Sequence, residues 1–389
     1  MRIFLVLLIW LSAAGMIFAA TLEQEEIVTS SEQEELVSSL GQEETEFLEQ
    51  EEITATHEKG EEEFNITEMI MHHIGDSHEW PIITFNRGDE EINISIPLPV
   101  ILWHKGLHVF MSSKFRGDKT VQIGDDYVTL AHEHIYLTNS NGDLTHNAEG
   151  EITNPKPFDV SITRNVASMF LSVLLILWLF GSAANGYSQR GGLSVPKGVQ
   201  KVVEPLILFV RDDIINQQIH DKKKANFFTP YLITLFVFII MNNIIGLIPF
   251  FPGGSNLTGN ISVTLVLGLI SFFAINLFSS KAYWKHLFTA PGIPLAIKFF
   301  IVPIELIGEI TKIFALILRL FANITAGHII ILSITSMIFI MVSFITPIFS
   351  MFLLLMMFCL EFLVAFLQAY IFTLLTTLFI GMAVNTESH

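Results

Sequence analysis

The sequence predicts an all-α polytopic membrane protein whose N-terminal region is exported and is partly disordered and partly β-rich. Three observations lead to this fold class. The chain of 389 residues is 51% hydrophobic and has 34 phenylalanines, more apolar surface than a soluble core of this size buries. About five apolar segments after residue 160 are long enough to cross a bilayer. Residues 21–160 carry 30 of the 38 acidic residues against 7 basic ones, so this part of the chain belongs in water.

The first 20 residues are typical of a signal peptide. Arg2 precedes the apolar run Ile3–Leu11, and small residues follow up to Ala20. If this segment stayed uncleaved as an anchor, Arg2 would still hold its start in the cytoplasm. Both alternatives export the residues that follow.

Two parts of the exported region differ in composition. Residues 21–64 are rich in Glu and poor in aromatic residues, which predicts an acidic disordered segment. Residues 65–160 are expected to form a small exported domain with strands at Ile92–Val100, Leu107–Ser112 and Tyr127–Leu137. Its scattered histidines favour surface positions over a metal site, and we expect neither metal nor cofactor; they are His72, His73, His78, His104, His108, His132 and His134.

The membrane domain is predicted to cover residues 161–389. The loop at 185–230 contains an amphipathic stretch, Val202–Ile215, that predicts a helix at the membrane surface or at a partner. The last two segments are long and should form a hairpin that turns at Phe344–Pro347. The five predicted membrane segments are Val166–Ala184, Tyr231–Phe251, Ile261–Ser280, about 295–343 and 347–384.

Basic residues in the loops predict the orientation. Loops 185–230 and 281–298 are rich in Lys and Arg, whereas loop 252–260 has none. The two basic loops should therefore be cytoplasmic, the N-terminal region periplasmic and the C-terminus cytoplasmic. A multi-pass protein of a bacterial inner membrane is the localisation that follows.

Several polar residues interrupt the last two membrane segments. A charge at the bilayer centre costs from about 3 to about 10 kcal/mol, so such a residue normally faces a cavity or a partner. Arg319 has no acidic residue within reach on its own helix, which argues against a local salt bridge. An ordinary core histidine and salt bridges near the cytoplasmic end stay open for some of the others. The residues are Glu305, Glu309, Lys312, Arg319, Asn323 and His328 in the first segment, and Glu361 and Gln368 in the second.

Two runs give a specific resemblance. Leu318-Arg319-Leu320-Phe321-Ala322-Asn323-Ile324-Thr325-Ala326-Gly327-His328 and the run from Leu360 to Phe372 resemble the two signature helices of the ATP synthase a subunit family. The resemblance implies that Arg319 is the essential arginine of the family and that Asn323 and Gln368 are its polar neighbours. It also implies that Glu305 belongs to the cytoplasmic half-channel. His328 and Glu361 hold the imidazole and the acid in the order of the mitochondrial form, the reverse of many bacterial members.

The function implied by this resemblance is that of the stator ion-channel subunit of a rotary F-type ATP synthase. With the c-ring it would form two offset half-channels that carry protons, or Na⁺, across the membrane. Its partners would be the c-ring, the peripheral-stalk b subunits and lipid, with no nucleic acid. The subunit would not itself be catalytic, and the chain has no G-x-x-x-x-G-K-[ST] nucleotide motif. A secondary ion or solute transporter and a structural anchor are the alternatives.

An antiparallel hairpin also predicts which residues lie at the same depth. Because both helices rise by the same amount per residue, paired positions should have a nearly constant sum of residue numbers. Arg319 with Gln368 and His328 with Glu361 give nearly equal sums. We therefore expect Arg319 and Gln368 side by side facing the ring, and His328 close to Glu361.

Overall fold

The computed structural model describes residues 75–87, 90–117, 119–147, 152–190, 195–248, 251–289, 295–340 and 346–384. The predicted signal peptide, the acidic segment at 21–64, the first half of the turn at 344–347 and the C-terminal His389 lie outside these ranges, as do His72 and His73.

Short antiparallel strands fill the part of the chain before residue 160. We refer to residues 75–163 as the β region. Val100, Leu102 and Val128 are fully buried and join two of its sheets in a small apolar core. The strand pairs are β1 (Glu79–Arg87) with β2 (Glu90–Pro97); β3 (Pro99–Trp103) between β4 (Leu107–Met111) and β8 (Phe158–Asp159); and β6 (Asp126–Ala131) between β5 (Val121–Ile123) and β7 (His134–Thr138).

Two of the predicted strands are each divided into two strands in the structure. The run Tyr127–Leu137 forms two strands, β6 and β7, because His132 and Glu133 take positive φ angles of 46° and 64° and reverse the chain. A turn of this kind normally has Gly or Asn, and neither residue type is present here to indicate it. The run Ile92–Val100 is also divided, into β2 and β3, and β1, β5 and β8 were not predicted.

Helices form the rest of the described chain, and the mostly helical fold is confirmed. Each predicted membrane segment is a helix: α4 (Arg164–Arg190), α7 (Lys222–Leu247), α8 (Ile261–Leu277), α10 (Leu295–Ile340) and α11 (Thr346–Val384). Three of them, α4, α7 and α11, are long and apolar enough to cross a membrane, and α8 is a shorter apolar helix. The exact number of spans stays a prediction. Shorter helices connect them: α5 (Gln200–Leu208), the π-helix η2 (Phe209–Ile215), α6 (Asn216–Gln218) and α9 (Lys281–Thr289).

Polar caps fix where two of these helices begin. Asp221 accepts a hydrogen bond from the Lys223 amide at the start of α7, and Asn260 accepts one from the Ser262 amide at the start of α8. Each side chain satisfies an amide that has no partner within its helix. The chain therefore leaves the loop at 251–260 and enters α8 at a defined residue.

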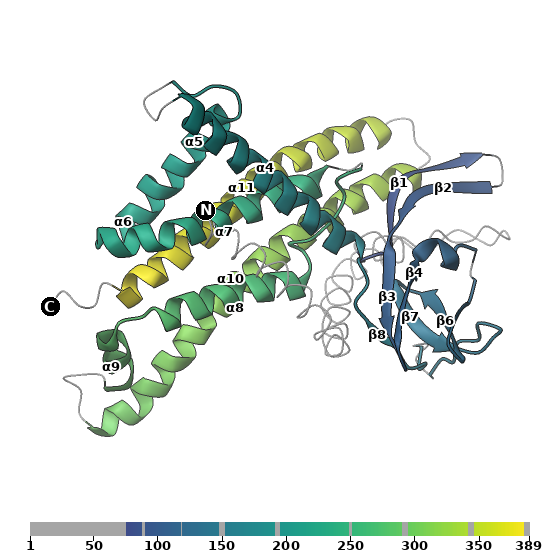
Figure 1. Ribbon diagram of the computed structural model, residues 1–389, viewed down its shortest axis with the longest axis horizontal. Coiled ribbons are helices and arrows are strands. Elements are labelled where there is room, and N and C mark those ends of the chain that lie inside the picture. The colour runs from purple at the N-terminus through teal and green to yellow at the C-terminus, as the bar shows by residue number, and fades with distance from the viewer. Residues whose placement is uncertain are drawn as a thin grey trace, which may run out of the picture.

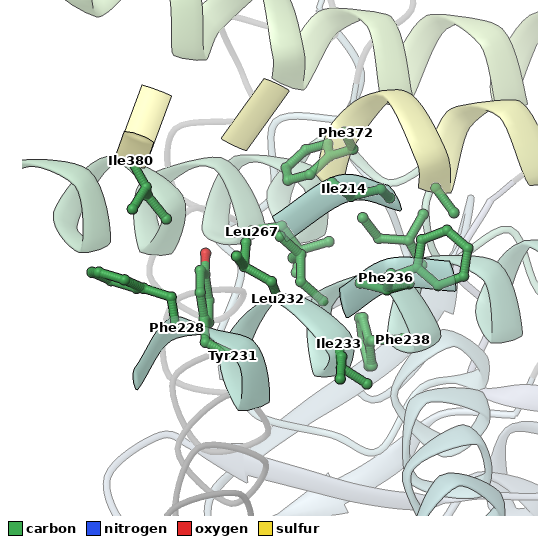
Figure 2. Close-up of a cluster of buried hydrophobic side chains, with 14 of the residues drawn as sticks. Ile214, Phe228, Tyr231, Leu232, Ile233, Phe236, Phe238, Leu267, Phe372 and Ile380 are labelled. Carbon is green, nitrogen blue, oxygen red and sulfur yellow. The ribbon is translucent and has the colours of Figure 1, made fainter. Parts of the chain in front are cut away.

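The helical core lies where α7 is surrounded by α8, α11 and η2 (Figure 2). Phe236, Leu232 and Phe372 are fully buried there, and Ile214 shows that the predicted amphipathic stretch packs one face against the bundle. In Figure 1 the strands lie at one end of the helices, whereas α6, α9 and the end of α11 lie at the other. Helices α10 and α11 run in opposite directions between these ends.

Candidate functional site

Helices α10 and α11 pack together and set the register of the site. The Asn323 amide nitrogen donates to the Gln368 side-chain oxygen over 3.1 Å. One turn further along α10, a Cβ added to Gly327 would lie 2.1 Å from the Glu361 Oε1 atom, so the two helices approach closely at this glycine. The residue numbers of these pairs sum to 691 and 688, which agrees with the antiparallel register that the sequence predicts.

A polar cavity lies beside this close approach, between α7, the loop that follows it, α10 and α11. Its enclosed volume is about 10 Å³, roughly the space of one water molecule. Its walls combine imidazole, carboxyl, amide and hydroxyl groups with only four apolar residues; they are Asn242, Asn243, Gly246, Leu247, Ser255, Asn256, Thr258, Asn323, Ile324, His328, Glu361 and Val364. His328 and Glu361 are therefore brought to one cavity, as predicted from the register.

Several polar atoms of this cavity have no hydrogen-bond partner among the described residues. They are Glu361 Oε2, Asn242 Oδ1 and both amide atoms of Asn256, all of them buried. Glu361 is only 7% exposed and Asn256 5%. Buried polar groups in native proteins are nearly always satisfied, by water where protein groups are absent. The lining thus offers hydrogen-bonding positions to water or to a transferred proton.

Other hydrogen bonds hold the cavity wall in place. The Thr258 hydroxyl donates to Asn243 Oδ1 over 2.7 Å, and the Asn243 amide nitrogen donates to the carbonyl of Ala365 on α11 over 3.1 Å. The Thr325 hydroxyl of α10 reaches the carbonyl of Gly259 over 3.3 Å. The loop between α7 and α8 is thereby joined to both helices of the hairpin.

Arg319 lies on the outer surface of α10. Its side chain is exposed, and within the described part of the chain no hydrogen bond or ion pair engages its guanidinium group. Ala315, Ala322 and Ala326 are exposed on the same side of the helix, so three small side chains lie beside the cation. Small residues let a second helix approach closely. Gln368 was expected beside Arg319 on the face towards the ring. It is 1% exposed and forms a hydrogen bond with Asn323, so it does not lie on the exposed face that carries Arg319.

A second polar group occupies the other end of α10. The Lys312 ammonium lies 2.5 Å from the Glu309 carboxylate and 5.4 Å from the centre of the Phe379 ring. Glu305 is partly buried, and its Oε2 atom has no hydrogen-bond partner among the described residues. The ion pair between Glu309 and Lys312 explains why these two charges are tolerated in the segment, as the salt-bridge alternative predicts. It does not explain Glu305.

The described histidines of the β region do not gather into one site. His78 lies 3.0 Å from Asp159, and His104 lies 2.9 Å from Asp126. Burial opposes charging of His78, but the hydrogen bond and the charge of Asp159 outweigh it and raise the pKa of His78. Burial lowers the pKa of His134 to about 4. Within the described ranges, no three His, Cys, Asp or Glu side chains cluster closely enough to hold a metal ion.

Sequence reasoning missed part of the cavity wall. Asn242, Asn243, Ser255, Asn256 and Thr258 line it, yet none of them was singled out. Two adjacent asparagines within the apolar segment Tyr231–Phe251 were a usable signal, because uncharged amides inside a membrane segment also need partners.

Comparison with known families decides where this chain belongs. Residues 166–381, more than half of the chain, match the family described as ATP synthase A chain. The chain belongs to the ATP synthase A chain family. Residues 69–160 match a second family, described only as a domain of unknown function (DUF8433).

Curated relatives of this family span a similar part of the chain. A protein named ATP synthase subunit a from Chlorobium phaeobacteroides (strain BS1) is 44% identical over 238 residues, covering 60% of this chain and 68% of the relative. One of the same name from Chloroherpeton thalassium is 41% identical over 238 residues, covering 60% and 69%. One from Anaeromyxobacter sp. is 35% identical over 269 residues, covering 66% and 63%.

Proposed function

We propose that this chain is the stator ion-channel subunit of a rotary F-type ATP synthase, which together with a c-ring forms two offset half-channels for protons or Na⁺. Two features along α10 carry this proposal. Arg319 is an exposed cation without a partner among the described residues, and further along the helix α10 helps to line a buried polar cavity. Family membership favours this function over a secondary transporter.

The exposed face around Arg319 suits a moving carboxylate. A fixed cation favours the ionised form of an acid that passes it, which promotes release of the ion on one side. The same positive charge repels a cation that would cross directly from one half-channel to the other. The alanines around Arg319 leave room for a ring helix to bring its carboxylate close.

Polar groups on both sides of Arg319 supply the two half-channels in this proposal. His328 is nine residues away along α10, about 14 Å at 1.5 Å per residue, and lies in the cavity with Glu361. Glu305 is fourteen residues away in the other direction, about 21 Å. Neither group reaches the other side of Arg319, so an ion must travel on the ring between them. We assign His328 and Glu361 to the outer half-channel, Glu305 to the cytoplasmic one, and Asn323 and Gln368 to the support of Arg319.

The proposed orientation puts the β region in the periplasm and the C-terminus in the cytoplasm of a bacterial inner membrane. Its support is that the strands and helices α6 and α9 lie at opposite ends of the helices (Figure 1), and that Lys222, Lys281 and Lys285 belong to the end without strands. Val202 and Leu208 are exposed on α5 at that end and offer a surface for the peripheral-stalk b subunits.

Replacing Arg319 tests the proposal. In membrane vesicles containing the intact complex, Arg319→Ala should abolish ion-driven ATP synthesis while the subunit stays assembled. Arg319→Lys should retain only part of the activity, since an ammonium differs from guanidinium in shape and hydration. Arg211→Ala is the matched control, because Arg211 is exposed and paired with Asp212 on η2. Normal synthesis by Arg319→Ala complexes would refute the proposed function.

A further inference from the structure

The loop between α7 and α8 is folded into the protein and forms one wall of the cavity. Ser255, Leu257 and Thr258 are each at most 2% exposed. Gly253 lies so close to the end of α7 that an added Cβ would be 2.3 Å from the carbonyl oxygen of Ile248. The wall formed by Ser255, Asn256 and Thr258 therefore depends on how this loop is held.

The β region contacts this loop directly through Trp80. The indole nitrogen of Trp80 donates to the carbonyl of Gly253 over 3.3 Å, and its ring meets that of Phe251 edge to face at 5.2 Å between centroids. Trp80 is 6% exposed, so the contact is buried rather than peripheral.

A second connection runs from the β region through the start of α4 to the cavity wall. Asp76 accepts hydrogen bonds from the backbone N–H of Asn165 over 2.9 Å and from the Thr163 hydroxyl over 2.8 Å. The Asn165 side-chain oxygen in turn accepts from the Ser255 hydroxyl over 2.7 Å. Ser255 is itself a lining residue of the cavity. Asp76, Asn165 and Ser255 thus form a continuous hydrogen-bonded connection from the β region to the cavity wall.

Asp76 also satisfies the beginning of α4. The first amides of a helix have no partner within it, and a carboxylate placed there is favoured by the helix dipole. Here the acceptor comes from a different part of the chain, 89 residues before Asn165. The Arg164 guanidinium reinforces the contact by donating to the Gly75 carbonyl over 2.6 Å. The Asn165 side chain is thereby held at a fixed position for Ser255.

We propose that the β region is a positioning element for the outer ion cavity: Asp76, acting through Asn165, and Trp80 together fix the loop whose Ser255, Asn256 and Thr258 receive the ion. This inference rests on the proposed function. Losing Asp76 should loosen the cavity wall and weaken ion uptake from the outer side, without altering Arg319 or the opposite half-channel. On α10 the loop is contacted by Thr325, which lies beyond Arg319 towards the cavity.

The test measures ATP synthesis by the intact complex in vesicles while the outer ion concentration is varied and the inner one is fixed. Asp76→Ala and Asn165→Ala should each raise the outer concentration that gives half-maximal rate by about threefold to tenfold, the effect of losing one or two hydrogen bonds. The double variant should show little more than either single one, because both break the same connection. Varying the inner concentration should show no such shift.

Asp126→Ala is the matched control. Asp126 is also a carboxylate of the β region that accepts hydrogen bonds, but its partners are His104 and Lys105 at the opposite end of β3 from α4. In Asp126→Ala the outer ion concentration that gives half-maximal ATP synthesis should equal that of the wild type. If Asp76→Ala does not assemble, Asp76→Asn keeps the shape and one acceptor, and hydrogen exchange of residues 251–260 should then be faster than in Asp126→Asn.

The outcomes separate this inference from the proposed function. An unchanged half-maximal outer concentration together with unchanged hydrogen exchange of 251–260 in the Asp76 variants overturns the positioning role. Equal shifts for the outer and inner ion, or fully additive effects of Asp76→Ala and Asn165→Ala, overturn it as well. If Arg319→Ala still abolishes synthesis in those cases, the proposed function stands and only the role of the β region fails.

Discussion

Replacing Gly327 with alanine should damage the site without weakening the helix. The added Cβ would lie 2.1 Å from Glu361 Oε1, 2.9 Å from its Cδ and 3.0 Å from its Cγ. Ordinary contacts of this kind are above 3.4 Å, so the carboxyl group must move by about 1 Å. Since a displacement of about 1 Å at a reacting group can cost up to a hundredfold in rate, we expect ion-driven ATP synthesis to fall tenfold to a hundredfold.

A second glycine on the same helix provides the control. No atom lies within 4 Å of the position where a Cβ would be added to Gly308. Both Gly→Ala changes should favour α10 by up to about 1 kcal/mol through helix propensity, so this effect is common to the two variants. Gly308→Ala should therefore assemble and synthesise ATP as the wild type does.

The assay is ATP synthesis by vesicles, normalised to the amount of assembled complex. Shortening the acid by one methylene in the double variant Gly327→Ala/Glu361→Asp should make room for the new Cβ and recover part of the activity relative to Gly327→Ala alone. Equal rates for Gly327→Ala and Gly308→Ala would show that the position of the Glu361 carboxyl does not limit ion transfer.

Two further predictions concern other contacts. Gly268→Ala would bring a Cβ within 2.3 Å of Ile317 Cγ1 and should destabilise the packing of α8 on α10 by about 1–3 kcal/mol, measured by thermal unfolding in detergent; Ile317→Ala in the same chain should reverse the loss. The raised pKa of His78 means that its contribution to stability is complete below its unfolded pKa of 6.5 and disappears as the pH rises through the folded value. Protection of the β region from proteolysis should therefore decline above pH 6.5 in the wild type relative to His78→Gln. His134 contributes little above pH 6.5, because its pKa of about 4 keeps it neutral in the folded state and the pH keeps it mostly neutral in the unfolded state. A constant difference between the two proteins over that pH range would contradict the assignment.

The helices were predictable because apolar length is a direct requirement of the membrane. All five predicted segments are helices, and the register of the last two could be read from polar residues spaced along them. The strands were less predictable, since β6 and β7 are joined by His132 and Glu133 in a conformation that their residue types rarely adopt.

The site was predictable where charge makes a residue conspicuous. Glu361 and His328 stand out in apolar helices, and the structure brings them to one cavity. The remainder of the wall comes from neutral residues such as Asn256 and Thr258, whose burial depends on a loop folding back between helices. That loop contacts Trp80 and Asn165, which are distant in sequence, and no local pattern encodes such contacts.

The cavity receives its imidazole from α10 and its carboxyl from α11, so its chemistry depends on what the two helices contribute together. An exchange of the two residue types between positions 328 and 361 would leave the inventory of polar groups in the cavity unchanged. Natural selection can therefore act on the content of the cavity while the residue at either position drifts. An intermediate carrying two acids or two imidazoles would still present polar groups to water from both helices. The cavity could therefore keep its polar content through an exchange in which neither position keeps its residue type.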